Sequence, residues 1–219
     1  MTREHLKVPE KNVREYAHEL AYRLACEQLA NIDDIEKQCR KSGAQYIPTR
    51  KAIIIEYLNQ SYQISFPNGE VSFAAGEEAV PIRDKILILH YFTQAKGTPL
   101  SNKTITYKEL HDGINYFSVF ATRTIKPLVM FFGEEPGQLL KTAEVLGGHK
   151  ADYGNTAVTI NAFSQVPVTI VLWQGDAEFA PEGSILFDST ISDYLTNDDI
   201  HTLCENITWK LVRLLKDRR

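Results

Sequence analysis

The part of the sequence that most constrains the fold is a series of three strand-like runs near the C-terminal end. Residues 157–163 alternate apolar and polar side chains, residues 166–173 are almost entirely apolar, and residues 184–188 form a third short run. Alternation is typical of a half-buried strand, and a nearly all-apolar run indicates a strand buried on both faces. Because only short links separate the runs, the sequence predicts an antiparallel meander.

Helix-like segments precede and follow this meander. Apolar residues recur at helical spacing over residues 10–30, 82–92, 117–132, 136–146 and 200–215, with a weaker helical stretch over 31–41. The helix over 82–92 is expected to lie in the core. Pro127 predicts a kink or a break within the helical segment that contains it.

A second set of strand-like runs lies in the first half of the chain. Residues 52–58 and 61–66 are separated by Asn59 and Gln60, which predicts a β-hairpin, and residues 70–75 suggest a third short strand. The sequence therefore predicts an α+β fold, with an antiparallel sheet of about five strands and helices packed against it. Since the chain contains no repeat, low-complexity tract or obvious linker, residues 1–219 are expected to form a single domain.

The charge distribution argues against a nucleic-acid partner. The net charge is −4 and the sequence pI is about 5.9, whereas nucleic-acid binding usually requires a basic face. One local basic cluster closes the last helix, where cations complement the helix dipole. Its members are Lys210, Arg213, Lys216, Arg218 and Arg219.

Hydropathy and cysteine usage indicate a cytoplasmic protein. No stretch approaches the ~20 apolar residues that span a bilayer, and the start of the sequence has no apolar run of signal-peptide length, so no membrane partner is expected. Cys26, Cys39 and Cys204 are far apart and form no Cys-x-x-Cys motif. This argues against a disulfide framework and against a zinc or iron–sulfur site made by this chain alone.

Short motifs in the second half carry a resemblance to a known family. They include Ile86-Leu-Ile-Leu-His-Tyr91, Tyr107-Lys-Glu-Leu110, Leu146-Gly-Gly148, Tyr153-Gly154, Trp173-x-Gly-Asp176 and Leu186-Phe-Asp188. The region from about residue 82 to 215 resembles the uncharacterised family DUF3786, a domain of unknown function. The resemblance implies relatives in anaerobic bacteria and archaea, some fused to small iron–sulfur domains of the type seen with corrinoid proteins. It suggests a redox or one-carbon setting, with an iron–sulfur or corrinoid protein as a possible partner.

Two irregular stretches are candidates for the walls of a ligand-binding cleft. Residues 107–123 mix aromatic and polar side chains without a regular period, and residues 148–155 combine glycines with a histidine and a tyrosine. We expect these stretches to fold toward each other and enclose a hollow, with the 173–178 loop at its rim. The candidate ligand-binding residues are Tyr107, His111, Asn115, Tyr116, Phe117, Arg123, Gly148, His149, Tyr153, Gly154, Asn155 and Trp173.

The chemistry of this predicted cleft leaves alternatives open. His149 could be an axial ligand of a tetrapyrrole, a metal ligand or a general base. The alternative is that its loop is a helix cap followed by ordinary surface structure. Arg123 could bind a carboxylate or phosphate group of a ligand, or it could form a buried pair with Glu109.

Acidic residues suggest a second candidate site. Asp176, Glu178 and Asp188 are expected to meet at one edge of the sheet, where carboxylates could hold a hard divalent cation or act in acid–base catalysis. The alternative is a solvated hairpin turn. The acidic residues before the last helix, including Asp199, are expected to cap it. His90 is expected to be a core residue.

Three functions are compatible with these observations. The first is a non-catalytic binding protein for a small ligand or cofactor of anaerobic redox metabolism, with a corrinoid or other tetrapyrrole as the most specific version. The second is an enzyme that uses carboxylates, with or without a divalent metal. The third is an accessory module that docks on an iron–sulfur partner, which predicts an exposed apolar patch.

Overall fold

A computed structural model of the chain describes residues 10–176 and 178–217, with side chains from residue 15 onward. Two sequence-based expectations involve residues outside this range. The expectation for the start of the chain depends on Met1 to Pro9, and the basic cluster includes Arg218 and Arg219. The α-helices are α1 (Glu10–Ala30), α2 (Ile35–Ser42), α3 (Ile82–Gln94), α4 (Gly113–Arg123), α5 (Ile125–Phe132), α6 (Gly137–Ala143) and α7 (Asn197–Asp217).

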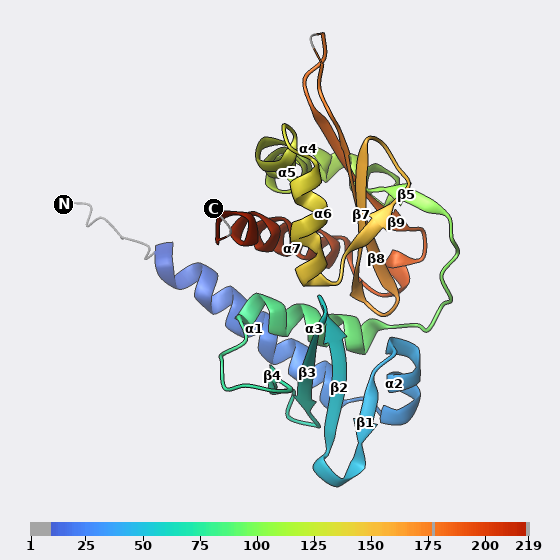
Figure 1. The fold of residues 1–219 in the computed structure, drawn as a ribbon. Helices are drawn as coiled ribbons and strands as arrows, with labels where there is room; N and C mark the ends of the chain where they lie inside the picture. Colours follow the sequence, from blue (N-terminus) through green and yellow to red (C-terminus); the bar gives the residue numbers. More distant parts are fainter. Residues whose placement is uncertain (1–9, 177, 218–219) are drawn as a thin grey trace, which may run out of the picture.

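The strands form two antiparallel sheets (Figure 1). The first has the order β1-β2-β3-β4 and consists of β1 (Gln45–Ile47), β2 (Ala52–Tyr57), β3 (Gln60–Ser65) and β4 (Val71–Phe73). The second has the order β5-β9-β8-β7-β6 and consists of β5 (Thr104–Thr106), β6 (His149–Ala151), β7 (Thr156–Phe163), β8 (Val166–Trp173) and β9 (Glu182–Asp188). The predicted meander is confirmed by the antiparallel pairing of β7 with β8 and of β8 with β9.

Helices cover one face of the five-stranded sheet. On this face α5 contacts β9, α6 contacts β7, and both helices contact α7. The β8 side chains of Val168, Ile170 and Leu172 are buried beneath these helices. The opposite, outer face carries Pro167 and Thr169, which are half-buried. Figure 1 shows α3 between the two sheets, with α1 packed along it.

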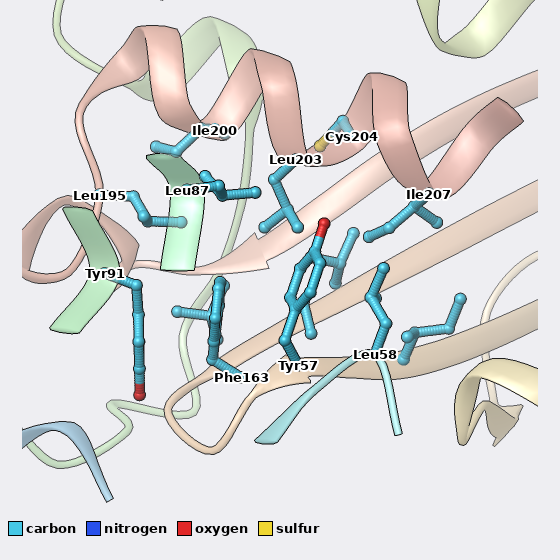
Figure 2. Packing of buried hydrophobic residues seen from close by; sticks show 14 of the residues in the cluster. Tyr57, Leu58, Leu87, Tyr91, Phe163, Leu195, Ile200, Leu203, Cys204 and Ile207 are labelled. Atoms are coloured by element: carbon cyan, nitrogen blue, oxygen red, sulfur yellow. The ribbon is translucent and has the colours of Figure 1, made fainter. Parts of the chain in front are cut away.

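Aromatic stacking joins the two sheets through α3. The ring of Phe163, at the end of β7, lies 3.9 Å from the ring of Tyr91 on α3 and 4.9 Å from that of Tyr57 on β2. Figure 2 shows Phe163 between the other two rings, below the apolar face of α7. All three side chains are buried, so one continuous apolar cluster extends across both sheets.

The β2–β3 hairpin differs from its prediction by one residue. Its turn consists of Leu58 and Asn59, both with positive φ, rather than Asn59 and Gln60. Positive φ at both positions suits the type I′ turn of a two-residue hairpin, but it is an uncommon conformation for leucine. Leu58 is buried, and its N–H donates to the carbonyl of Ala162 at 3.0 Å, so contact with the second sheet compensates for the strained turn.

The break in the helical segment 117–132 occurs at Thr124, not at Pro127. Pro127 is the third residue of α5, where the missing N–H has no intrahelical partner to lose. The hydroxyl of the buried Thr124 donates to the carbonyl of Phe120 at 2.8 Å. The chain thus turns between two short helices, and the buried Thr124 hydroxyl at the turn keeps a hydrogen-bond partner.

The α+β class is confirmed, but the strands form two sheets where the sequence predicted one of about five strands. The three-residue strands β1, β5 and β6 were not predicted, because strands this short carry no measurable period. Throughout the described part of the chain, no helix combines the length and apolar character needed to cross a membrane.

Candidate functional site

The predicted cleft between residues 107–123 and 148–155 is not formed, and this expectation is wrong. The first stretch follows β5 and continues into α4, which packs against α5 and α7 on the helical side of the sheet. The second stretch includes β6, at the opposite edge, and a loop whose Tyr153 lies on the outer face. The sheet itself therefore separates the two stretches.

Residues of the first stretch divide between core and solvent. Tyr107 is buried, and its ring stacks on Phe120 at 3.9 Å. Burial, together with the charge of Asp198, raises the pKa of the Tyr107 hydroxyl. The exposed members are His111, Asn115, Tyr116 and Arg123, whereas Phe117 is half-buried with the Lys108 ammonium 4.3 Å above its ring.

The predicted alternative of a buried Arg123–Glu109 pair is also wrong. Glu109 accepts hydrogen bonds from the backbone N–H of Thr106 at 2.7 Å and from the Thr106 hydroxyl at 3.0 Å. This capping box begins the short helical turn of residues 107–109. Arg123 is exposed, so the two side chains have separate roles.

The glycines of the 148–155 stretch pack closely against neighbouring parts of the protein. A Cβ added to Gly148 would lie 2.7 Å from the Ala143 Cβ at the end of α6, and the Gly148 N–H donates to the Ala143 carbonyl at 2.8 Å. At Gly154, where φ is +54°, an added Cβ would lie 2.7 Å from Val171 Cγ1. These close approaches explain both glycines by packing within the protein.

Four of the predicted residues do gather, on the outer face of the five-stranded sheet. The Gly154 backbone lies against Trp173, and the Asn155 side-chain oxygen accepts from the Gln174 N–H at 3.0 Å. Tyr153 shares a hydrogen bond of 3.2 Å with Thr104 on β5. Two hollows flank this outer-face cluster, one of about 380 Å³ beside residues 150–157 and one of about 180 Å³ between Tyr153 and β9. His149 is exposed on the edge strand β6.

The three predicted metal-binding carboxylates do not come together. Asp176 and Glu178 lie in the β8–β9 loop, where Asp176 accepts from the backbone N–H groups of Glu178 and Phe179. Asp188 lies at the other end of β9, roughly 20 Å away along a strand that rises about 3.3 Å per residue. The prediction overlooked that antiparallel pairing of β8 and β9 places the loop and Asp188 at opposite ends. Among the residues whose side chains the structure describes, no group of three or more histidine, cysteine or acidic residues could hold a metal ion.

Asp188 instead fixes the connection that leads into β5. Its carboxylate accepts from the backbone and hydroxyl of Ser101, from the N–H of Asn102, and from the backbone and hydroxyl of Thr190. Burial alone would raise the pKa of Asp188, but these hydrogen bonds lower it to about 2. A carboxylate saturated in this way is a structural anchor.

Asp199 and His90 are explained in the same way. Asp199 accepts from the N–H and hydroxyl of Thr196 at the start of α7, and from His90 Nδ1 at 2.7 Å. Burial opposes ionisation of Asp199, but the His90 and Thr196 hydrogen bonds lower its pKa overall. The predicted helix cap is thus present, and His90 joins α3 to α7.

A hollow that the sequence did not reveal lies where α1, α3 and α7 meet. We call it the Asp84 hollow. Its volume is about 430 Å³, and it is lined by His18, Pro81, Ile82, Arg83, Asp84, Glu205, Asn206, Trp209, Lys210 and Arg213. The two hollows above are lined mainly by strands and loops, whereas this one is lined mainly by helices. Its lining residues on α7 recur at helical spacing, so they share one face of that helix.

The base of the Asp84 hollow is a buried charge network. The Asp84 carboxylate, with 4% of its side chain exposed, accepts from Asn206 Nδ2 at 2.8 Å and from Lys210 Nζ at 3.1 Å. The buried Tyr57 hydroxyl lies 3.4 Å from the same carboxylate. Burial, and then the negative charge of Asp84, raise the pKa of Tyr57 well above its usual value. Tyr57 therefore stays protonated and can only act as a neutral hydrogen-bonding group.

The hollow is also lined by an ion pair and by a partly exposed tryptophan. Arg83 forms an ion pair of 2.7 Å with Glu205, and both side chains are partly exposed. Trp209 is 45% exposed and Arg213 is exposed. An aromatic side chain that lines the same hollow as a fixed set of charges is suited to orient a small organic ligand.

The sequence contained one indication of this hollow. Asp84 is a carboxylate on a helix predicted to be buried, and acidic residues are almost never fully buried without partners. Its partners lie 27 to 126 residues away along the chain, so the pattern of one helix could not identify them. Lys210 and Arg213 had a sufficient explanation as cations near the end of α7.

Fold and site together define an α+β protein with two antiparallel sheets and a charged hollow where α1, α3 and α7 meet. The family model described as "Domain of unknown function (DUF3786)" matches residues 34–209. Since this match covers most of the chain, the protein belongs to that family, and the family region also includes the first sheet. Searches of curated proteins and of solved structures found no match.

Proposed function

We propose that the protein binds a small organic ligand, and that the Asp84 hollow is the binding site. The observation that carries this proposal is the Asp84 carboxylate, 4% exposed and fixed by Asn206 and Lys210 at the base of a hollow. Ligand pockets in proteins measure roughly 300–1,000 Å³ and combine apolar walls with a few oriented polar groups. A volume of about 430 Å³ falls in this range.

The origin of the lining residues supports the same proposal. Except for Pro81, which precedes α3, they come from three helices, and the Asp84 network also includes Tyr57 of β2. Groups fixed in this way lose little freedom when a ligand binds, which favours affinity. The Arg83–Glu205 pair holds α3 and α7 together at the rim.

A first experiment asks whether a ligand accompanies the protein. We expect native mass spectrometry of the purified full chain to show a bound small molecule. If the ligand is lost during purification, the low-molecular-weight fraction of a cell extract should restore it. Binding would then be followed by fluorescence of Trp209 in a Trp173→Phe variant.

The matched control is Trp209→Phe, in which Trp173 on the outer face is the only tryptophan. A ligand in the Asp84 hollow should change emission in the Trp173→Phe protein and leave the control unchanged. A response confined to the control would place the ligand on the outer face. The absence of any co-purified or added ligand signal would contradict a binding function altogether.

Two more specific functions that the sequence suggested, tetrapyrrole binding and docking on a partner protein, stay predictions. A corrinoid or other tetrapyrrole cofactor would use His149, whose exposure leaves its ring accessible. Adding cobalamin or haem should then shift the visible absorbance of the wild type but not of a His149→Ala variant. Docking on an iron–sulfur or corrinoid partner would use exposed apolar residues of α4 and α5, where Ile114 and Met130 are each 71% exposed.

A further inference from the structure

The charges that line the Asp84 hollow do not balance. Three lining residues carry fixed positive charges and two carry negative charges, and each of the two carboxylates already has a cation at ion-pair distance. Asp84 pairs with Lys210, and Glu205 pairs with Arg83. Among the described residues, Arg213 has no carboxylate within ion-pair distance. The hollow therefore has one positive charge in excess.

The placement of this excess charge suggests how a ligand would lie. Trp209 and Arg213 are four residues apart on α7, so they are neighbours on one helical face. Both line the hollow, and the 45% exposure of Trp209 leaves ring surface available for contact. A planar group against Trp209 would bring a substituent on the same molecule close to the Arg213 guanidinium, which is suited to bidentate contact with carboxylate or phosphate.

The first turn of α3 reinforces the same polarity. Pro81 is the N-cap and contributes no side-chain acceptor, and residues 81–84 are among those that line the hollow. The first N–H groups of a helix have no intrahelical partner and carry partial positive charge. This contribution adds to the guanidinium charge, while Lys210, on the more exposed side of the pair, neutralises the Asp84 carboxylate.

We propose that the ligand of the Asp84 hollow is a small organic anion with a planar body, whose phosphate or carboxylate group pairs with Arg213 while the body packs on Trp209. This assignment rests on the proposed function, because it names the ligand class of the same site. It excludes cationic ligands, which would meet the excess positive charge.

The test uses four probes that share one aromatic ring and differ in the head group. Phenyl phosphate, phenylacetate, benzyl alcohol and benzylamine are titrated into the Trp173→Phe protein at low ionic strength, with Trp209 emission as the signal. We expect at least one of the two anions to bind about tenfold or more tightly than benzyl alcohol, as for a hydrogen bond to a charged group. Comparing the two anions distinguishes phosphate from carboxylate recognition.

Arg213→Gln is the decisive variant, and Arg40→Gln, on the exposed surface of α2, is its control. The first should reduce anion affinity about tenfold and leave benzyl alcohol binding unchanged, whereas the second should change neither. Equal or tighter binding of benzylamine would overturn the assignment, as would anion binding that Arg213→Gln does not weaken. If none of the probes binds up to its solubility limit, the ligand class is wrong. The native mass spectrometry experiment would then decide separately whether the hollow binds anything.

Discussion

The Asp84–Lys210 pair gives the sharpest test of how the structure is held together. Asp84→Asn keeps the shape of the side chain but removes its charge, and it places an amide where two donors, from Asn206 and Lys210, now converge. Removing one partner of a fully buried pair costs about 3–5 kcal/mol. Lys210 is 34% exposed and can regain water contact, so we expect the free energy of unfolding to fall by about 2–3 kcal/mol.

A double-mutant cycle separates the pair from its surroundings. Lys210→Met alone should cost about 2 kcal/mol, because Asp84 keeps Asn206 as a hydrogen-bond donor. The double variant should cost about 1 kcal/mol less than the sum of the single variants, since each side chain has then lost the same partner. Lys96→Met, which breaks the exposed pair with Asp193, is the control and should cost less than about 1 kcal/mol.

The assay is equilibrium unfolding in urea, followed by far-ultraviolet circular dichroism and by tryptophan fluorescence. Coincident transitions with unchanged slopes are needed before the free energies are compared. Costs that add to within about 0.3 kcal/mol would show that Asp84 and Lys210 do not interact energetically. A cost for Asp84→Asn no larger than that for Lys96→Met would refute the description of Asp84 as a buried charge that depends on its partners.

Three further predictions concern other parts of the fold. Because the pKa of Asp188 is lowered to about 2, the ionised carboxylate stabilises the fold above pH 4, and this stabilisation is lost as the pH falls toward 2. Asp188→Asn should therefore lower the free energy of unfolding by about 1 kcal/mol at pH 7. Urea unfolding should show that the difference from wild type becomes smaller in acid. His201 has a buried Nε2 without a partner among the described residues, and its pKa is lowered chiefly by burial. An NMR titration should therefore place this pKa below 6.5, with stability decreasing as the pH falls through it, and a raised value would contradict the described environment. Phe163→Leu should lower the free energy of unfolding by about 1–2 kcal/mol through loss of its stacking with Tyr91 and Tyr57, and a neutral result would show that the ring contacts contribute little.

The sequence predicted those elements whose pattern is local. The meander of β7, β8 and β9 and the helices α1, α3 and α7 have enough residues for a period to be recognised. The turn lies one residue earlier than predicted because the Leu58 N–H donates a stabilising hydrogen bond to the Ala162 carbonyl, about a hundred residues away. The division of the strands into two sheets was hidden for the same reason, since strand patterns do not specify partners.

The predicted site failed where it depended on three-dimensional arrangement. Tyr153, Gly154, Asn155 and Trp173 were grouped correctly, because both loops flank the paired strands β7 and β8. Residues 107–123 were assigned to the same cleft by composition alone, which does not reveal the face of the sheet on which a segment lies. Asp188 was predicted to be a metal ligand because the sequence does not show the five hydrogen bonds that its carboxylate accepts in the fold.

The Asp84 network is difficult to explain by stability alone. A buried ion pair is expensive to desolvate, and well-packed apolar side chains of similar volume often stabilise a protein as well or better. Elsewhere, the two sheets are joined by apolar packing, in the stack of Phe163 with Tyr91 and Tyr57. The hollow instead places a lysine between a buried carboxylate and the solvent. An Asp84→Leu/Lys210→Met variant separates the two explanations. A binding site predicts a folded protein that retains stability but binds organic anions more weakly, because the polar base that orients the ligand is gone while Arg213 remains. A structural clamp predicts loss of stability with no separate effect on binding.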